Sequence, residues 1–304
     1  MSTSALSVDP LWPRAGDWPA FDALPEGERA DLTLLGIPTW RTSLSATGAH
    51  ATPAAVRAAL RRYSEHAAGL AIEGLRLTDA GDVSEPDGAE GEARATAAMR
   101  AAVARSTVTV AVGGDNALTV PAALGAYGSD LGTAGLITLD AHHDLRDGVS
   151  NGSPVRRLVE AGLGGARIVQ LGIADFANSA AYTRRAADLG ITVVTRDALH
   201  GRPWEDVMAE ALEIAGAAGG PVHVDLDVDV CDRSVAPGCP ASVPGGLAAW
   251  ELRRVARLAA ASPLVRSLDL AEVDATADAA DERTVRLAAL LVLEAAAGVA
   301  SRAS

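Results

Sequence analysis

The chain has 304 residues, of which 26 are basic and 39 are acidic, so its formal net charge is -13. Every basic residue is an arginine, and the absence of lysine excludes P-loop nucleotide sites, protein kinases and Schiff-base enzymes, whose chemistry needs a lysine amine. The acidic excess argues against a nucleic-acid partner, because phosphate binding demands a basic surface.

Short apolar runs alternate with longer, alanine- and arginine-bearing segments along most of the chain. The predicted strands are residues 32–37, 107–112, 135–139, 167–173, 191–194, 222–228 and 265–273. The predicted helices are residues 53–63, 92–104, 118–127, 155–161, 179–189, 204–218, 247–260 and 282–297. This alternation predicts an α/β fold in which a buried parallel sheet carries helices on both faces.

Two segments stand outside this alternation. Residues 1–30 contain proline and tryptophan without a clear period, so we expect an N-terminal extension packed on the rest of the chain. Residues 84–91 are acidic and contain glycine, which predicts a surface loop. No internal repeat or composition shift marks a domain boundary, so residues 31–304 are expected to form a single domain.

The sequence carries no sign of a membrane or secretory destination. It opens without the pattern of a signal peptide, so we expect a cytoplasmic protein. Its longest apolar segment, residues 287–300, falls short of the roughly 20 residues that span a bilayer and contains Glu294. We therefore expect a packed helix there and no membrane partner.

Polar residues lie at the ends of four of the predicted strands or directly after them. In an open parallel sheet, ligands bind beyond the carboxyl ends of the strands, so these positions are candidates for a site. The four segments are Gly113-Gly-Asp-Asn116, Asp140-Ala-His-His-Asp144, Asp225-Leu-Asp-Val-Asp229 and Glu272-Val-Asp274. We expect their side chains to meet at one edge of the sheet.

The composition of these segments predicts a metal site. Side chains two apart in a strand share a face, so Asp225, Asp227 and Asp229 are expected on one side, where their charges repel unless a cation lies between them. Taken singly, each signal is weak: an aspartate after a strand is commonly a helix N-cap, and a lone His142 is commonly a structural histidine. Together, carboxylates and one imidazole favour Mn²⁺ over Zn²⁺ or Fe²⁺, and over Mg²⁺ or Ca²⁺, which rarely take histidine.

These segments resemble the motifs of the ureohydrolase family, which includes arginase, agmatinase and formimidoylglutamase. The family pattern GGDH, DAHxD, SxDxDxxDPxxAPG with a later PGG, and a final Glu corresponds here to residues 113–116, 140–144, 225–246 and Glu272. Residues 36–38 and 51–57 resemble the opening strand and first helix of the family, so the similarity covers about residues 31–300. It implies an arginase-like, three-layer αβα fold around a mainly parallel sheet, as one catalytic domain.

The resemblance also implies a centre of two Mn²⁺ ions per subunit, with Asp140 and Asp227 bridging them. The implied ligands are Asn116, Asp140, His142, Asp144, Asp227 and Asp229. Asn116 stands where the family has histidine, and its neutral amide is a weaker donor, so we expect one ion to be held less tightly. Asp225 stands where the family has Ser or Thr.

Within the family, the segment Ser150-Asn-Gly-Ser-Pro154 lacks the histidine of the agmatinase SHGTP segment and is similar to SSGTPF of the formimidoylglutamases. Asp144-Leu-Arg146 and the asparagine at 178 favour the same subgroup. That substrate carries two carboxylates, and Arg146 is expected either to bind one of them as a planar fork or to be an ordinary surface arginine. Asn151 and Glu272 complete the expected substrate-binding set.

The implied reaction converts N-formimidoyl-L-glutamate to L-glutamate and formamide, a step of histidine degradation, by attack of a hydroxide shared by the two ions. Glu272 would pair with the cationic end of the substrate, and Asp144 would pass a proton to the departing amine. Both are therefore candidate catalytic residues, and the expected partner is a small cationic amidine or guanidine.

Three alternatives stay open. The first is an agmatinase or another guanidino-acid ureohydrolase, which releases urea instead of formamide. The second is a two-metal phosphoesterase, although its usual GNH[DE] motif is absent. The third is a non-catalytic relative, which Asn116 and Asn151 favour because both depart from the agmatinase pattern. Family resemblance implies a homotrimer or homohexamer.

Overall fold

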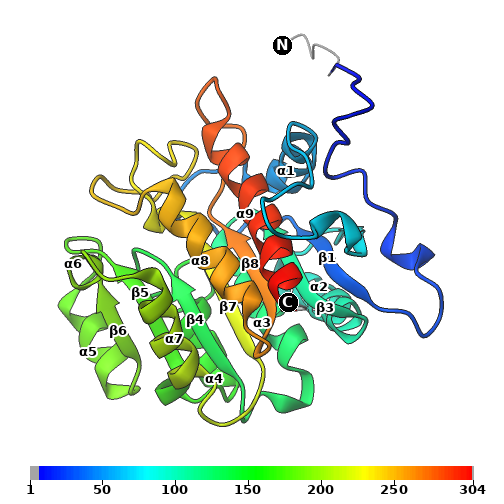
Figure 1. Ribbon diagram of the computed structural model, residues 1–304. Helices are drawn as coiled ribbons and strands as arrows, with labels where there is room; N and C mark the ends of the chain where they lie inside the picture. The colour runs from blue at the N-terminus through cyan, green and yellow to red at the C-terminus, as the bar shows by residue number, and fades with distance from the viewer. Residues whose placement is uncertain (1–6, 303–304) are drawn as a thin grey trace.

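The computed structural model describes residues 7–302 and contains, within that range, one sheet of eight parallel strands in the order β2-β1-β3-β8-β7-β4-β5-β6 (Figure 1). The strands are β1 (Ala30–Ile37), β2 (Leu77–Asp82), β3 (Ser106–Gly113), β4 (Gly135–Leu139), β5 (Ile168–Ile173), β6 (Thr192–Thr195), β7 (Val222–Asp227) and β8 (Val265–Ala271). The α-helices are α1 (Thr52–Leu60), α2 (Gly88–Ala104), α3 (Thr119–Tyr127), α4 (Pro154–Ala161), α5 (Ala180–Asp188), α6 (Arg196–Leu199), α7 (Trp204–Ala215), α8 (Ala249–Ala261) and α9 (Arg283–Ser301).

The helices form a layer on each face of the sheet. On one face α1 packs on α9, α9 on α8, and α8 on α7, while α2, α3 and α4 pack together on the other (Figure 1). The central strands β3, β4, β7 and β8 are buried along almost their whole length, because helices cover both of their faces. The predicted three-layer αβα fold is confirmed, and the sheet is entirely parallel within the described residues.

The strand β2 was not predicted. Its sequence Leu-Thr-Asp-Ala-Gly-Asp contains no apolar run, and its second half is partly or fully exposed. Among the strands of the sheet it pairs with β1, and on its other side Asp79 makes a single isolated bridge with Ala20, so it lies at one edge and needs few buried side chains. Edge strands of this kind give little hydrophobic signal.

The expectation of a loop over residues 84–91 is wrong in its second half, because α2 begins at Gly88. The first turns of α2 face the solvent, so they carry few apolar residues. Gly91 lets the first turn of α2 pack closely against the backbone of Glu85, because a Cβ at this position would lie 2.4 Å from the backbone oxygen of Glu85. Its glycine therefore permits close packing and does not end the helix.

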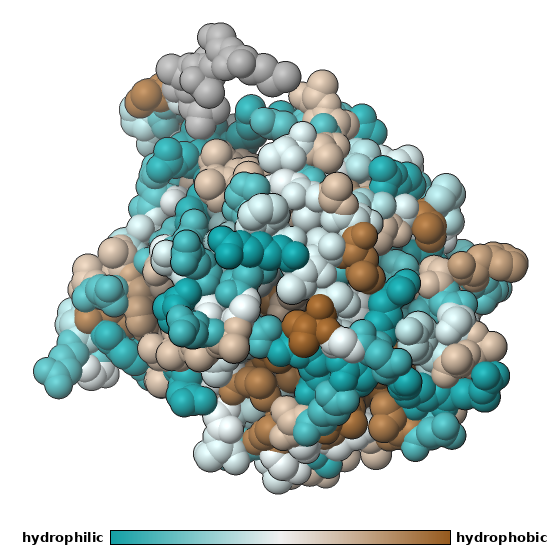
Figure 2. Space-filling model, turned by 180° about the vertical axis from the view of Figure 1, so that it is seen from behind, coloured by the Kyte–Doolittle hydropathy of each residue, from teal (hydrophilic) through white to brown (hydrophobic). Residues whose placement is uncertain are grey.

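Within residues 7–302, α9 is the one helix with the length and apolar composition to cross a bilayer, and 83% of its most apolar window is buried in the fold. Its buried Glu294 pairs with Arg253 and Arg257 of α8. These features are those of a core helix, as expected from the sequence. On the face shown in Figure 2, apolar residues form small separate patches among polar ones.

The strands that carry the polar motifs are neighbours at the centre of the sheet, in the order β3-β8-β7-β4. Their parallel direction brings all four motifs to the same edge. Residues that precede the sheet include the short 3-10 helix η1 (Phe21–Ala23), and Pro19 accepts a backbone hydrogen bond from Asp79 of β2. The division into an extension (1–30) and one domain (31–304) stays a prediction.

Candidate metal centre and its pocket

A cavity of about 460 Å³ opens at the carboxyl edge of the sheet. Its acidic floor is formed by residues from the central strand ends, namely His142, Asp144, Asp227, Asp229 and Glu272. Its walls come from the surrounding loops and include Leu44, Ser45, Arg146, Asn151, Gly152, Phe176 and Tyr182. Most of the residues expected at the site therefore meet around one space.

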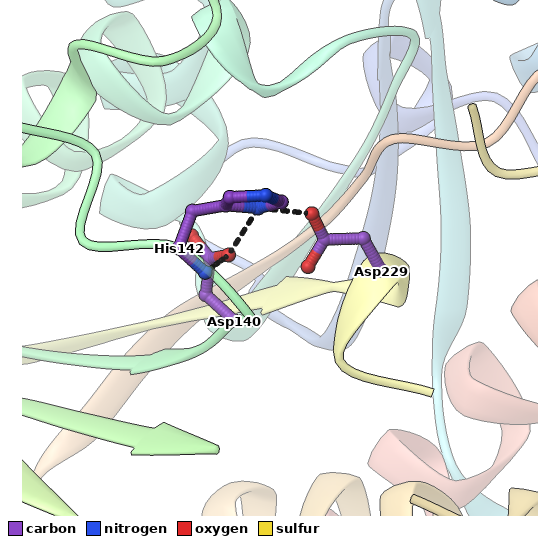
Figure 3. Close-up of side chains that lie close together, drawn as sticks. All are labelled: Asp140, His142 and Asp229. Carbon is purple, nitrogen blue, oxygen red and sulfur yellow. Dashed lines mark hydrogen bonds and ion pairs between the residues drawn. The ribbon is translucent and has the colours of Figure 1, made fainter. Parts of the chain in front are cut away.

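The loop after β4 brings His142 between two carboxylates (Figure 3). The Nδ1 atom of His142 lies 2.6 Å from Oδ2 of Asp229 and 3.5 Å from Oδ1 of Asp140. One donor atom from each of these three residues lies within 4.8 Å of the others, and both aspartates are almost fully buried. The spacing is suited to donors around a single cation.

Asp227 and Asp229 reach the floor by different routes. Asp227 is the last residue of β7, and its Oδ1 accepts a hydrogen bond from the backbone N–H of Asp229, 2.8 Å away. Asp229 lies in a 3-10 turn, η7 (Val228–Val230), and its Oδ1 accepts from the backbone N–H of Ala141. The expectation that both share one strand face with Asp225 is therefore wrong for Asp229, because the chain turns immediately after Asp227.

Asn116 joins the ends of β3, β8 and β4. Its backbone N–H donates to Oε1 of Glu272 at 2.9 Å, and its side-chain Nδ2 donates to Oδ2 of Asp144 at 2.6 Å. The amide oxygen accepts from the hydroxyl of Thr119. Since a hydroxyl can donate or accept, Thr119 can also support the reversed amide, in which the oxygen of Asn116 faces the floor as a ligand.

Three cavity residues have backbone conformations that are unfavourable for residues other than glycine. The φ angles of Asp144, Phe176 and Glu272 are 52°, 64° and 60°, in the left-handed region. Such conformations cost of the order of 1 kcal/mol each or more and persist where the surrounding structure enforces them. Their concentration at one cavity is typical of a functional site.

The carboxyl groups on the floor are buried close together, which disfavours their charged forms. Burial and neighbouring carboxylates raise the pKa of Asp140 to about 7 and the pKa values of Asp144 and Asp227 well above their usual range. Burial raises the pKa of Glu272 to about 8. Burial opposes the charged form of His142, but its carboxylate neighbours raise its pKa to about 11. Bound cations would relieve this strain.

The donors on the floor fit manganese. Oδ2 of Asp140 is buried and has no hydrogen-bond partner among residues 7–302, so it is available to a ligand. Carboxylate oxygens with one imidazole are the mixture that suits Mn²⁺. Asp225 does not line the cavity, because it lies deeper in β7, where it faces Asp269 of β8.

The model of the family described as "Arginase family" matches residues 30–298. The chain belongs to the arginase family. A formimidoylglutamase of Halalkalibacterium halodurans is 34% identical over 280 residues, which cover 88% of this chain and 87% of that relative.

Solved structures agree with this membership of the arginase family. The crystal structure of formimidoylglutamase from Bacillus subtilis has a TM-score of 0.88 and 30% identity, covering 99% of this chain and 96% of that one. A Trypanosoma cruzi formiminoglutamase solved with Mn²⁺ has a TM-score of 0.83 and 25% identity, covering 94% of this chain and 100% of that one. The resemblance identified from the sequence motifs is confirmed, while the role of each individual residue stays a prediction.

Several residues that line the cavity were not predicted from the sequence. Leu44, Phe176 and Tyr182 line the cavity from loops and from the first turn of α5. Phe176 is fully exposed. An isolated aromatic or leucine in a loop carries no local pattern, so only the fold places these residues at the mouth. His143 adjoins His142 but does not line the cavity, and its Nδ1 lies 2.7 Å from Oε1 of Gln170.

Proposed function

We propose that this chain is a manganese-dependent hydrolase of a C–N bond in a linear amidine, with N-formimidoyl-L-glutamate as substrate and L-glutamate and formamide as products. The formimidoylglutamase of 34% identity over 88% of the chain supports this choice. The observation that carries it is the charge pattern of the cavity, whose floor is acidic and whose wall holds Arg146. Such a cavity suits a molecule that is cationic at one end and anionic at the other.

We propose that six residues at three strand ends supply the ligands of two metal ions, as the family resemblance implies: Asn116 after β3, Asp140, His142 and Asp144 after β4, and Asp227 and Asp229 at the end of β7. When bound, Mn²⁺ would supply a water acidic enough to act as a nucleophile at neutral pH. The ion beside Asn116 is proposed to be the weaker, because a neutral amide replaces an imidazole there.

Glu272 is the proposed partner of the substrate cation. Two donors, the backbone N–H of Asn116 and Nδ2 of Asn151, hold its Oε1 at 2.9 and 2.7 Å. Its Oε2 accepts no hydrogen bond from the described residues, which leaves that oxygen for an amidinium N–H. Asp144, buried on the floor, is proposed to take up a proton and deliver it to the departing amine.

Arg146 is the proposed site for a substrate carboxylate. It lies in a loop on the cavity wall and makes no ion pair with any residue between 7 and 302. Gly152 gives it room, because a Cβ at that position would lie 2.7 Å from Cδ of Arg146. A guanidinium can bind a carboxylate through two parallel hydrogen bonds. The other expectation, an ordinary surface arginine, predicts no effect of its removal on substrate binding.

A substrate panel tests the proposal. With added Mn²⁺, we expect turnover of N-formimidoyl-L-glutamate with release of formamide, and little turnover of agmatine, arginine or guanidinobutyrate. Arg146→Met should raise KM for the formimidoyl substrate at least tenfold, since a charge-assisted pair is lost. Release of urea from a guanidino compound would replace the proposed substrate, and no hydrolysis at all would favour a non-catalytic member of the family.

The assembly and location also belong to this proposal. Family resemblance supports a homotrimer or homohexamer with two Mn²⁺ per subunit, and a cytoplasmic location is proposed beside it. Light scattering after size exclusion measures the subunit number, and metal analysis of the same sample measures the ions per chain. A monomer, or fewer than one ion per chain after loading with Mn²⁺, would contradict it.

A further inference from the structure

The side chain of Asn151 connects Leu44 and Glu272, which share no hydrogen bond of their own. Its Oδ1 accepts a hydrogen bond from the backbone N–H of Leu44, 3.0 Å away, and its Nδ2 donates to Oε1 of Glu272 at 2.7 Å. The backbone N–H of Leu44 can only donate, so the orientation of the amide is fixed. Both ends of the amide are therefore engaged within the chain.

Leu44 belongs to the loop of residues 38–48, here called the 38–48 loop, which runs from β1 to the 3-10 helix η2 (Ala49–Ala51) and lines the cavity with Leu44 and Ser45. A carboxylate holds each end of this loop. At the first end, Asp87 accepts hydrogen bonds from the backbone N–H groups of Trp40 and Arg41. At the second end, Asp274 accepts from the hydroxyl of Thr47 and the backbone N–H of Gly48. The tip is less packed, since Leu44 is 58% exposed. The bond to Asn151 is the side-chain hydrogen bond that holds this tip.

We infer that Asn151 is a positioning residue, which couples the placement of the 38–48 loop over the pocket to the orientation of Glu272. By holding Oε1 of Glu272 it directs the other carboxylate oxygen to the substrate, and by holding Leu44 it fixes the wall that the substrate meets. This deepens the proposed function, because it assigns Asn151 an action through two neighbours instead of a direct contact with substrate.

Only a short amide meets both demands at this position. An aspartate would still accept from Leu44 but would present a second carboxylate to Glu272 in place of a donor. An alanine would lose both bonds. Comparison of Asn151→Asp with Asn151→Ala therefore separates the bond to Leu44 from the bond to Glu272. Asp87→Ala is a matched control, because it loosens the first end of the same loop and removes no hydrogen bond of Glu272.

Hydrogen exchange of the Leu44 amide, measured by NMR on the full chain, tests the coupling without any turnover. We expect Asn151→Ala to reduce protection of this amide about tenfold, the loss of one ordinary hydrogen bond. Asn151→Asp should keep that protection. Glu272→Ala should reduce it as well, although no hydrogen bond joins Glu272 to Leu44, because Asn151 loses the second residue that holds its amide. Unchanged protection of Leu44 in both Asn151→Ala and Glu272→Ala would overturn the inference.

Kinetics with N-formimidoyl-L-glutamate and Mn²⁺ test the second effect of Asn151, the orientation of Glu272. Asn151→Asp should lower kcat by about 10–100-fold, the usual effect of losing a supporting contact to a site residue, and Asp87→Ala should mainly raise KM. Mn²⁺ affinity of Asn151→Ala should stay within about twofold of the wild type, which separates the effect from loss of metal. Equal losses of kcat in Asn151→Asp and Asp87→Ala would reduce Asn151 to a general structural role.

The two proposals fail in different ways. If the wild-type chain hydrolyses no compound of the panel, the proposed function is lost, and the exchange of the Leu44 amide still decides the coupling. If the wild type is active while Asn151→Asp keeps its full kcat, the proposed function stands and the positioning role is refuted.

Discussion

The buried acidic floor predicts that the metal-free chain loses stability as the pH rises. The folded-state pKa of Asp140, about 7, and that of Glu272, about 8, lie above the ordinary values of 3.8 and 4.5. A group with a raised folded-state pKa stabilises the fold fully below its ordinary pKa, and this contribution is lost as the pH rises through the folded value. The raised pKa of His142, about 11 against 6.5, acts in the same direction above pH 6.5.

The size of the effect follows from these pKa values. One pKa unit corresponds to about 1.4 kcal/mol, so between pH 5 and 8 Asp140 alone removes about 3 kcal/mol and Glu272 alone about 4 kcal/mol. A chain of 304 residues unfolds with an entropy of about 0.6 kcal/mol per degree. The loss from Asp140 alone therefore lowers the Tm by about 5 °C, and the loss from Glu272 alone by about 6 °C.

Mn²⁺ should cancel this loss, because metal ligands bind in their deprotonated form. The assay is thermal unfolding between pH 5 and 8, with chelator and with excess Mn²⁺. We expect the Tm gain from Mn²⁺ to grow with pH. Asp227→Asn removes one of the buried titrating carboxyls, so it should weaken the metal-free pH dependence and abolish the gain from Mn²⁺. Asp188→Asn, at the exposed end of α5, should change neither. A metal-free Tm that is constant or rises from pH 5 to 8 would refute the reasoning.

Three further predictions concern single side chains. Asp227→Ala should remove bound manganese, measured by metal analysis, and lower turnover at least about 100-fold, because metal binding depends on this carboxylate. Asn116→His should tighten Mn²⁺ binding about tenfold in calorimetry by supplying an imidazole; unchanged affinity would mean that Asn116 is not a ligand. Glu294→Ala leaves the half-exposed Arg253 and Arg257 without their buried partner and should cost about 2 kcal/mol in denaturant unfolding, with kcat unchanged.

The sequence was most informative where burial is complete. The predicted strand 135–139 coincides with β4, because every residue of this strand is buried and apolar or small enough to pack. The prediction failed at the edge strand β2 and at the first turns of α2, where solvent takes the place of a packing partner and the hydrophobic period disappears. These errors did not affect the placement of the site motifs, because the motifs lie at the ends of central strands.

The residues of the pocket walls could not be predicted from the sequence, for a different reason. Strand ends converge by a rule of sheet geometry, so Asp140, Asp227 and Glu272 can be placed together from the sequence. The contact of Leu44 with Asn151 joins residues 107 positions apart through loops, whose paths no periodicity describes. Loop contacts of this kind set the shape of the cavity, and hence its choice of substrate.

Asp225 and Asp227 show what alternation along a strand leaves undecided. Both lie on one face of β7, but Asp227 ends the strand, while Asp225 lies two residues, roughly 6.6 Å, below the edge. There it faces Asp269, which also accepts from His223 in a fully buried layer. Burial and the charge of Asp269 raise the pKa of Asp225 well above its usual range, which favours the protonated form of this carboxyl. The formal net charge of -13 counts every carboxyl as ionised, including Glu272, whose pKa is raised to about 8, so it overstates the negative charge of the folded chain at pH 7, even before any cation binds.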